Sequence, residues 1–335
     1  MKNNKLRTAL VGCGTIAPVH LSALAELDAC EVVSLCDAKA ERAEALRARY
    51  AEGARVFTDF GEMLREMPEI DVVHICTPHY LHTPMAIAAL EAGKHVFLEK
   101  PVGISEEDIA RLVKAEKAAK GKLCICFQNR FNDTTAAIDR LVERYGAPIG
   151  CRAFVNWKRN EAYYTESGWR GAYATEGGGV MINQAIHTLD LMLRYMGKPL
   201  SLSATTANHH LKGVIEVEDT CEIFLRFESG VGNFYATTSY SANASIILEL
   251  QFPSHTVAMI GGKVYDNGTL VPLTEDTAET VGKDYWGKGH KGLISNFYHT
   301  VTEDLPVPVT LDSGAVSLSV LLAAYRSHGE TVDLA

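Results

Sequence analysis

Apolar and polar residues alternate in blocks along the first 128 residues of this 335-residue chain. Short apolar runs are separated by stretches rich in Ala, Glu, Lys and Arg, a composition that favours helices. Because the runs are apolar at nearly every position, they predict strands buried on both faces of a parallel sheet. The predicted strands span residues 6–12, 31–37, 71–77, 95–99 and 122–127.

The pattern changes after residue 128. Helices are predicted over 131–145 and 181–196, near 290–303 and near 312–328. Shorter β-like runs fall near 149–157, 201–208, 217–228, 231–240, 245–252 and 255–265, with hairpin signals "ESG" at 228–230 and "DNG" at 266–268. We therefore predict two domains, an α/β domain over residues 1–128 and an α+β domain over 129–335. The second domain is expected to hold a large, mainly antiparallel sheet, wide enough for one face to serve oligomerisation.

Composition and charge narrow the range of partners. Apolar residues make up 47% of the chain and charged residues 22%, as in soluble globular proteins. No apolar run approaches the roughly 20 residues of a membrane span, and the start shows no signal-peptide pattern. The net charge of −9 argues against nucleic acid. The eight cysteines lack paired CxxC spacing, and no H-E-x-x-H motif occurs. We expect a cytoplasmic protein with reduced thiols, no metal and a small-molecule partner.

A turn of small residues follows the first predicted strand. In "ALVGCGTIAPVHLSAL" (9–24), Gly12, Gly14 and Ala17 have the spacing G-x-G-x-x-A and open the first helix. Small residues here let backbone N–H groups approach a pyrophosphate, although an ordinary strand–helix turn would look similar. Asp37 closes the second strand, 20 residues after Ala17, where a carboxylate would bind the adenosine ribose. That carboxylate repels a 2′-phosphate and so favours NAD over NADP. Lys39 and Arg42 lie close by and could bind a 2′-phosphate, so NADP remains an alternative.

The segment "ICTPHYLH" (75–82) ends a later strand of the same sheet. Thr77 and Pro78 are expected to border the cofactor crevice, which lies at the carboxyl edge of such sheets. His82, and less so His79, could contact ribose or nicotinamide, and both could equally be solvated. His74 lies in mid-strand and is predicted to be a hydrogen-bonded core histidine.

In "HVFLEKPV" (95–102) a buried strand runs directly into Glu99 and Lys100, and Pro101 ends it. An ammonium near a reacting carbinol would stabilise developing alkoxide charge. A neighbouring carboxylate would limit the cost of burying that ammonium. The alternative is an exposed ion pair at a strand end.

The predicted helix 181–196 has a narrow polar strip. At 100° per residue, Asn183, His187, Asp190 and Arg194 fall within about 60° of one another, and most other positions are apolar. This pattern predicts a helix that lines a cavity. In the alternative interpretation His187 is a core histidine bonded to Asp190.

Aromatic and basic residues share the loop "WKRNEAYYTESGWRGAY" (157–173), a combination that suits sugar rings and anionic substituents. Tyr163, Tyr164 and Arg170 are the candidate substrate contacts in it. Packing or oligomer contact is the alternative for any single tyrosine. His290, at the start of a late helix, is a further pocket candidate.

Together these motifs resemble the Gfo/Idh/MocA oxidoreductase family. The resemblance rests on the 12–17 turn, Thr77-Pro78, "AGKHVFLEKP" (92–101) and "GGGVMINQAIHTLDLM" (177–192), and it covers nearly the whole chain. It implies a Rossmann domain followed by a domain with a large, mainly antiparallel sheet, commonly joined into dimers or tetramers. We therefore expect a homodimer or homotetramer.

The resemblance also implies roles. Lys100 would lie beside the nicotinamide, Glu99 would hold the cofactor side of the strand end, and His187 would act as general base. The family often has a cis peptide bond before this proline, so the resemblance also implies one at Lys100–Pro101. Many members carry aspartate where this chain has Asn183, and an amide cannot relay a proton. The predicted cofactor-binding residues are Gly12, Gly14, Thr15, Ile16, Asp37, Thr77, Pro78, His82, Glu99, Lys100, Trp169 and Arg170.

Three functions remain open at this stage. The first is NAD-dependent oxidation of a secondary hydroxyl, at C3, of a sugar, sugar acid, glycoside or polyol. The second is a lyase or glycosidase that uses transient C3 oxidation and elimination, which would need further acid–base groups such as Tyr163, Tyr164 or His290. The third is a non-catalytic sugar–NAD sensor, which has no need of both Lys100 and His187.

Overall fold

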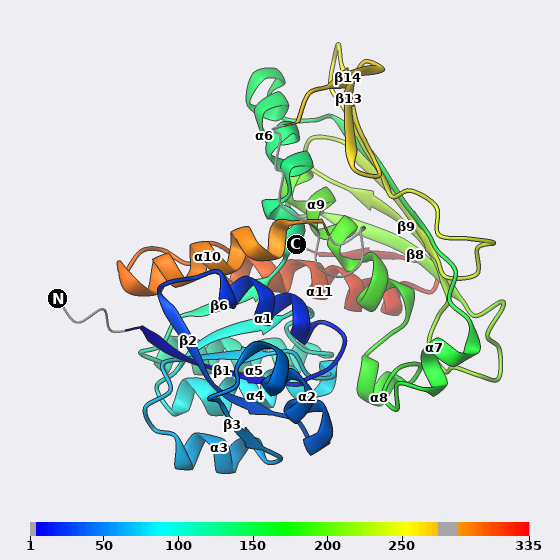
Figure 1. The fold of residues 1–335 in the computed structure, drawn as a ribbon. Helices are drawn as coiled ribbons and strands as arrows, with labels where there is room; N and C mark the ends of the chain where they lie inside the picture. Colours follow the sequence, from blue (N-terminus) through cyan, green and yellow to red (C-terminus); the bar gives the residue numbers. More distant parts are fainter. Residues whose placement is uncertain (1–4, 274–286, 335) are drawn as a thin grey trace. The chain divides into compact units, whose positions relative to one another are not determined.

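The computed structural model describes residues 5–273 and 287–334, and these form two compact units (Figure 1). The first unit contains the described residues of 5–103, 107–131 and 287–314, and the second contains 104–106, 132–273 and 315–334. The predicted boundary at 128 lies close to the change at residue 131. The segment 287–314 belongs to the first unit, whereas the sequence-based division placed it in the second domain.

The first unit is built on a six-stranded parallel sheet with the order β3-β2-β1-β4-β5-β6. This is the doubly wound Rossmann order, in which ligands bind beyond the carboxyl ends of the strands. The strands are β1 (Leu6–Val11), β2 (Cys30–Cys36), β3 (Arg55–Phe57), β4 (Val72–Ile75), β5 (His95–Glu99) and β6 (Leu123–Cys126). The helices are α1 (Ala17–Ala25), α2 (Ala40–Tyr50), α3 (Phe60–Glu66), α4 (His79–Glu91), α5 (Glu106–Ala118), the short 3₁₀ helix η1 (Gln128–Phe131) and α10 (Gly289–Thr302).

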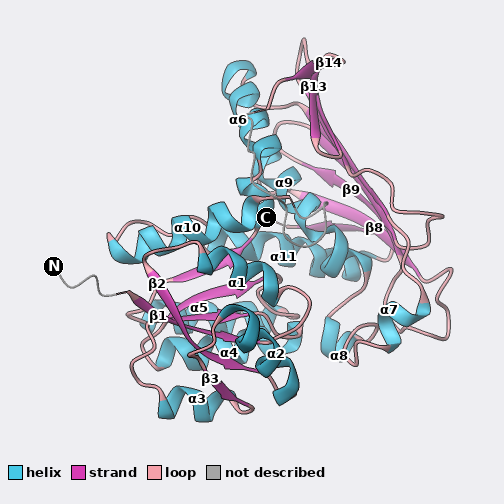
Figure 2. Ribbon diagram, in the orientation of Figure 1, coloured by secondary structure: helices cyan, strands magenta, loops and turns pink. Residues whose placement is uncertain are grey.

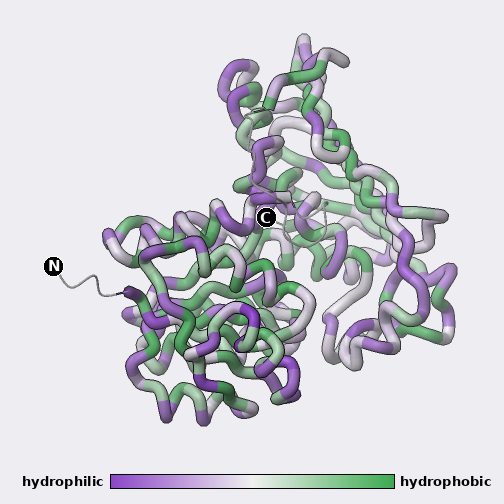
Figure 3. Tube along the Cα trace, viewed as in Figure 1, coloured by the Kyte–Doolittle hydropathy of each residue, from purple (hydrophilic) through white to green (hydrophobic). Residues whose placement is uncertain are grey.

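Burial explains why these strands could be predicted. Every residue of β4 and β6 is buried, as expected for central strands covered by helices on both faces. The tube in Figure 3 is accordingly hydrophobic through the middle of this sheet. Strand β3 was not among the predicted strands because it is only three residues long and begins with an exposed arginine. Helix α10 packs against α1, so a late segment of the chain completes this unit (Figure 2).

The second unit is built on a nine-stranded sheet with the order β14-β13-β12-β11-β7-β10-β9-β8-β15. Strands β7 and β10 pair in parallel, and the other pairs are antiparallel. The strands are β7 (Gly150–Asn156), β8 (Ser201–Ala207), β9 (Thr220–Arg226), β10 (Val231–Thr237), β11 (Ile247–Gln251), β12 (Thr256–Ile260), β13 (Lys263–Asp266), β14 (Thr269–Val271) and β15 (Thr331–Asp333). The helices are α6 (Asp133–Tyr145), α7 (Glu161–Thr165), α8 (Tyr173–Glu176), the π turn η2 (Met181–Ala185), α9 (Ile186–Met196) and α11 (Leu311–Ser327).

Strand alternation sets the two faces of this sheet. Along β9 buried and more exposed residues alternate strictly, and helix α9 packs on β7 on the buried side. Both predicted hairpin turns are confirmed, between β9 and β10 and between β13 and β14. The single strand predicted over 255–265 is wrong, because the chain turns back at Gly261, with φ of 58°, and forms β12 and β13. Among the described residues, no helix has the length and apolarity needed to span a bilayer.

Candidate functional site

The turn after β1 leaves room for a ligand at the start of α1. Gly12 has φ of +90°, and a Cβ there would lie 2.6 Å from the carbonyl carbon and oxygen of Cys76. A Cβ on Gly14, by contrast, would meet no atom within 4 Å. Helix α1 begins directly afterwards with Ile16 as its N-cap residue, and no side chain caps it. Backbone N–H groups at a helix start beside open space fit a pyrophosphate.

Asp37 lies beside this turn. Its carboxylate accepts hydrogen bonds from the backbone N–H of Cys13, at 2.8 Å, and of Lys39, at 2.9 Å. The carboxyl end of β2 and the glycine turn are therefore tied together, as the predicted ribose-binding role requires. The small turn, the uncapped helix and the carboxylate together fit a dinucleotide. Of the remaining predicted contacts in this unit, Thr15 is exposed, Ile16 and Thr77 are half-buried, and Pro78 is the N-cap of α4.

His82 joins two of the predicted cofactor segments. Its ring is buried, with Nδ1 2.7 Å from the carbonyl oxygen of Pro101 and Nε2 2.8 Å from that of Thr77. Burial lowers the pKa of this imidazole, partly opposed by the two backbone contacts. The structure thus gives His82 a positioning role behind Thr77 and Pro101, and direct contact with the cofactor stays a prediction.

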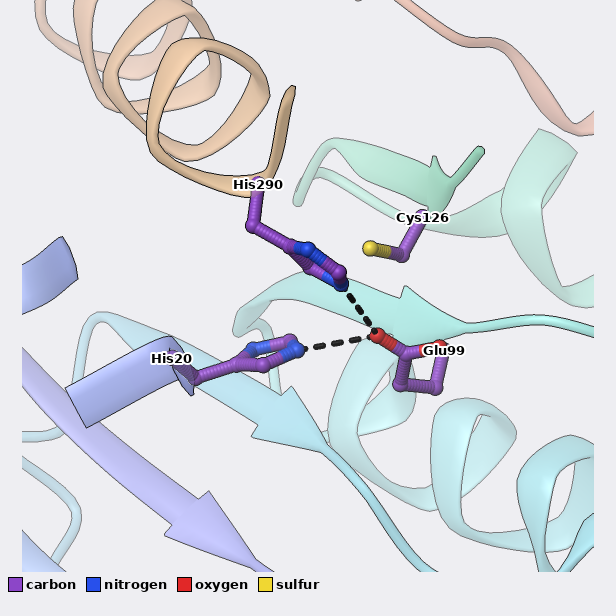
Figure 4. Close-up of side chains that lie close together, drawn as sticks. All are labelled: His20, Glu99, Cys126 and His290. Carbon is purple, nitrogen blue, oxygen red and sulfur yellow. Dashed lines mark hydrogen bonds and ion pairs between the residues drawn. The ribbon is translucent and has the colours of Figure 1, made fainter. Parts of the chain in front are cut away.

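Glu99 lies at the centre of a buried cluster at the end of β5 (Figure 4). Its side chain is buried, and Oε1 accepts a hydrogen bond from His20 Nε2 at 2.9 Å and lies 3.8 Å from His290 Nε2. Oε2 accepts from the backbone N–H of Lys100 at 3.2 Å. The next peptide bond, Lys100–Pro101, is cis. Glu99 therefore holds the backbone from which the Lys100 side chain departs.

A row of hydrogen bonds continues from this cluster through the core. His20 Nδ1 lies 2.9 Å from His74 Nδ1, and His74 Nε2 lies 3.1 Å from the Tyr298 hydroxyl. The Tyr298 hydroxyl lies 2.6 Å from Thr8 Oγ1. The prediction that His74 is a hydrogen-bonded core histidine is confirmed.

The charge on Glu99 fixes the direction of its hydrogen bond with His20. Burial opposes ionisation of Glu99, but the hydrogen bond from His20 and the nearby His290 imidazole outweigh it and hold its pKa well below the usual value. Burial also lowers the pKa of His74 far below its ordinary value. An ionised Glu99 can only accept, so His20 donates to it from Nε2, and a neutral His74 has one donor and one acceptor nitrogen toward His20 and Tyr298. A buried row of hydrogen bonds therefore continues from the residue that holds the Lys100 backbone.

Cys126 is the fourth residue of this cluster, beside His20, Glu99 and His290. One donor atom from each of His20, Glu99, Cys126 and His290 lies within 4.8 Å of the other three, a spacing that could hold a metal ion. Burial, together with the charge of Glu99, raises the thiol pKa well above its ordinary value, so the protonated thiol is favoured. We interpret the cluster as a hydrogen-bonded anchor for Glu99. The absence of a metal, expected from the sequence, stays a prediction.

In the second unit the polar helix begins with a wide turn. Residues 181–185 form the π turn η2, and the regular helix α9 starts at Ile186. A π turn advances by less than 100° per residue, so Asn183 and His187, four residues apart, still lie on the same side of the helix; such turns are frequent at functional sites. Asn183 and His187 are half-buried, whereas Asp190 is buried and accepts from Ser317 Oγ at 3.1 Å.

Two buried glutamates hold the glycine-rich turn before this helix. Glu218 accepts from the backbone N–H groups of Gly179, at 2.9 Å, and Met181, at 3.0 Å, and from the Tyr325 hydroxyl. A Cβ on Gly179 would lie 1.8 Å from the Glu218 carbonyl oxygen, so only glycine fits. Glu176 accepts from the backbone N–H of Gly171 at 2.6 Å and from Asn183 Nδ2. Burial raises the pKa of Glu176 and of Glu218 to about 7.

Sequence reasoning missed both glutamates as site residues. Glu176 directly precedes the Gly177–Gly179 run, which is the one local signal that could have drawn attention to it. Glu218 lies in a different segment, 39 residues from Gly179, and no spacing rule connects the two.

The aromatic loop supplies a second group of side chains, one of which contacts the residue that follows Asn183. The Arg170 guanidinium lies 4.4 Å from the Tyr163 ring centre and 4.8 Å from that of Trp169. The Tyr163 hydroxyl accepts from Nε2 of Gln184, the residue after Asn183, at 2.9 Å. Cation–π stacking therefore fixes Arg170 and Tyr163 as one rigid group.

Two predicted substrate contacts lie in the interior instead. Tyr164 is 3% exposed and packs in an apolar cluster with Leu211, Ile215 and Val217. Its hydroxyl lies 3.4 Å from Thr238 Oγ1. His290 is also 3% exposed and belongs to the Glu99 cluster of the first unit. The structure therefore gives both residues packing partners, and we do not include them among the proposed substrate contacts.

A Rossmann unit with an open glycine turn, followed by a unit with a large mixed sheet, defines a two-domain NAD-dependent oxidoreductase. Comparison with known families supports this class. The family model of the Gfo/Idh/MocA oxidoreductases with an NAD-binding Rossmann fold matches residues 6–127, and that of the Gfo/Idh/MocA C-terminal domain matches residues 136–258. The chain belongs to this family.

Named relatives include dehydrogenases and a reductase of sugars and of inositol. The chain is 27% identical over 260 residues to D-glucoside 3-dehydrogenase of Escherichia coli K12, which covers 75% of this chain and 72% of that protein. It is 32% identical over 231 residues to 1,5-anhydro-D-fructose reductase of Ensifer adhaerens, 67% of each chain. Among solved structures, the WlbA dehydrogenase of Bordetella pertussis in complex with NADH and UDP-GlcNAcA superimposes with a TM-score of 0.87 and 29% identity, covering 100% of this chain and 99% of that one.

Proposed function

We propose that this protein is an NAD-dependent dehydrogenase that oxidises a secondary hydroxyl, at C3, of a sugar, sugar acid, glycoside or polyol. The observation that carries the proposal is the position of Lys100. This residue follows β5 in the same Rossmann unit as the open glycine turn, and its backbone N–H donates to the buried Glu99 carboxylate. Similarity to D-glucoside 3-dehydrogenase and to a dehydrogenase bound to a nucleotide sugar acid supports the substrate class. The homodimer or homotetramer and the cytoplasmic location remain proposals from composition and family resemblance.

In this proposal the chain's own residues divide the work. The glycine turn and the start of α1 bind the pyrophosphate, and Asp37 binds the adenosine ribose. When bound, NAD accepts the hydride at C4 of its nicotinamide ring. Lys100 holds the substrate oxygen and stabilises the negative charge that develops on it.

His187 removes the hydroxyl proton. An uncharged imidazole can accept the proton of an alcohol while the C–H bond of the same carbinol carbon breaks. The neighbouring Arg170 and Tyr163 offer a cation and an aromatic face to the sugar ring or to an anionic substituent. The proposal therefore assigns proton transfer to His187, charge stabilisation to Lys100 and substrate recognition to the aromatic loop.

A substrate screen tests the proposal directly. Purified protein is incubated with NAD or NADP and with UDP-sugar acids, hexoses, alkyl and aryl glucosides or inositols, and reduced nicotinamide and carbohydrate products are followed together. We expect NADH and a 3-keto product with at least one sugar. Release of aglycone without accumulating NADH would instead indicate oxidation and elimination, and binding without turnover would indicate a sensor.

Two variants then test the residue roles. Lys100→Ala and His187→Ala should each lower kcat by about 100-fold or more, the scale of a positioned acid–base group. Lys198→Ala and His299→Ala, at exposed positions, serve as matched controls that should keep wild-type turnover. Full turnover in both active-site variants would refute the assigned mechanism.

A further inference from the structure

Asn183 carries no charge, but the structure places a buried carboxylate directly against it. We propose that Glu176 is a positioning residue that fixes the Asn183 amide with its NH₂ group turned inward and its carbonyl oxygen presented to the sugar hydroxyl. This inference rests on the proposed function, since it names how one substrate contact of that site is oriented.

The contacts of Glu176 leave it little freedom. Its side chain is 0% exposed, and its two oxygens accept from different partners. Oε2 accepts the backbone N–H of Gly171 at 2.6 Å, and Oε1 accepts from Asn183 Nδ2. The first bond ties Glu176 to the loop that carries Arg170, and the second ties it to the π turn that carries Asn183.

The chemistry of the pair determines which end of the amide faces Glu176. An ionised carboxylate only accepts hydrogen bonds, so it selects the NH₂ end of Asn183. The carbonyl Oδ1 must then point away from Glu176. Asn183 is half-buried, so part of this residue is exposed at the surface of the unit. Glu176 thus makes Asn183 an acceptor, which is what a substrate hydroxyl needs in order to donate its proton in a defined direction.

The electrostatic surroundings allow Glu176 to carry out this role near neutral pH. Burial raises its pKa to about 7, while the N–H of Gly171, the Asn183 amide and the charge of Arg170 lower it and Glu218 raises it. The phenols of Tyr163 and Tyr164 also interact electrostatically with Glu176. If Glu176 becomes protonated it can donate to Oδ1, and the amide would then turn its NH₂ group outward.

Exchanging the two functional groups tests the pair. In Glu176→Gln, the new amide can donate to Oδ1 of Asn183, which turns the Asn183 NH₂ outward and removes the acceptor. In Asn183→Asp, two carboxylates face one another and must share a proton. In the double variant E176Q/N183D, the amide introduced at position 176 donates to one oxygen of the carboxylate introduced at position 183, and the other oxygen of that carboxylate is again an acceptor. The exposed Glu228→Gln is the control for loss of a carboxylate.

We expect kcat/KM at pH 8 to fall about 10- to 100-fold in each single variant, the scale of one charged hydrogen bond. The double variant should recover to within about threefold of wild type, and E228Q should match wild type. Coupling between the two positions that appears in urea-unfolding stability but not in kcat/KM would overturn the proposal, because the pair would then be merely structural. A double variant as slow as the singles would also overturn it.

A turnover-independent readout separates this inference from the proposed function. If the wild-type protein reduces NAD with no sugar of the panel, the proposed function fails. Selective ¹⁵N-asparagine labelling then follows the Asn183 side-chain amide, assigned by its loss in Asn183→Asp. Protection of these amide protons above pH 7, measured against the intrinsic exchange rate at the same pH and lost on acidification and in Glu176→Gln, would support the positioning role. Rapid exchange unaffected by Glu176→Gln would refute it.

Discussion

Substitution of two glycines in the same turn, Gly12 and Gly14, should separate an effect on folding stability from an effect on cofactor binding. Gly12 has φ of +90°, and its missing Cβ would lie 2.6 Å from Cys76 backbone atoms and 2.7 Å from the Thr77 nitrogen. Gly14, two residues later, has open space where its Cβ would be. We therefore predict that Gly12→Ala destabilises the empty protein, whereas Gly14→Ala folds normally but binds NAD poorly.

The magnitudes follow from these contacts. A left-handed φ costs a non-glycine residue about 1–2 kcal/mol. Forcing a methyl group into packed atoms typically costs a further 1–3 kcal/mol. Gly12→Ala should thus lose about 2–5 kcal/mol, a large part of the 5–15 kcal/mol typical of a folded domain. At Gly14, where φ is not left-handed, alanine should be neutral or slightly stabilising, by up to about 1 kcal/mol. Its methyl group would occupy the space expected for the pyrophosphate, and NAD affinity should fall at least about tenfold.

The assay needs two measurements on each variant. Urea unfolding without cofactor gives the stability of the fold, and calorimetric titration with NAD gives the affinity. Gly53→Ala is a matched control at a glycine of the same unit whose Cβ would also meet no atom within 4 Å. Wild-type NAD affinity in Gly14→Ala would show that the pyrophosphate does not bind in the open space beside Gly14. Wild-type stability in Gly12→Ala would refute the argument from close backbone approach.

Two further predictions concern the Glu99 cluster. First, Glu99→Gln should cost about 1.5–3 kcal/mol at pH 7, because a charged acceptor is lost. The pKa of Glu99 is depressed well below its unfolded value near 4.5, so its stabilisation is present above that value and is lost progressively as the pH falls from there toward the folded-state pKa. Urea unfolding of both proteins from pH 7 down to pH 3.5 should show the difference beginning to shrink near pH 4.5, with part of it retained at pH 3.5. Second, Glu99 already accepts from histidine and the Cys126 thiol is held protonated, so we expect no stoichiometric metal in the purified protein and unchanged NAD binding after EDTA. One equivalent of bound zinc, measured by elemental mass spectrometry, would instead make this cluster a metal centre.

Local sequence patterns were sufficient for most elements of the fold. Doubly buried strands such as β4 appear as continuous apolar runs, and hairpins are indicated by sequences such as "DNG", where Asn267 and Gly268 adopt positive φ. The same local reasoning found the glycine turn and Asp37. It did not reveal the π turn at 181–185, and it failed in the run 255–265, where the chain turns back and forms two strands.

Partners far apart in the sequence could not be predicted in the same way. The start of a late helix makes His290 a pocket candidate, but nothing in the sequence connects it with Glu99, from which its Nε2 lies 3.8 Å away. Tyr164 looked equivalent to Tyr163, but one enters the apolar cluster and the other contacts Arg170. The hydrogen bond between Thr8 and Tyr298 spans 290 residues of sequence. Such choices depend on tertiary packing, and no spacing rule contains them.

The buried glutamates share a physical role that explains why they accompany the candidate catalytic segments. Glu99 accepts the N–H of Lys100, Glu176 that of Gly171, and Glu218 those of Gly179 and Met181. Each of these N–H groups lies at a strand end, in a glycine turn or in a π turn, where no regular ladder supplies an acceptor. A buried carboxylate is costly unless donors surround it, so each unit that retains such a group gains fixed backbone geometry in return. The uncharged Asn183 is then no sign of a lost site, because its functional state is set by the carboxylate against which it packs.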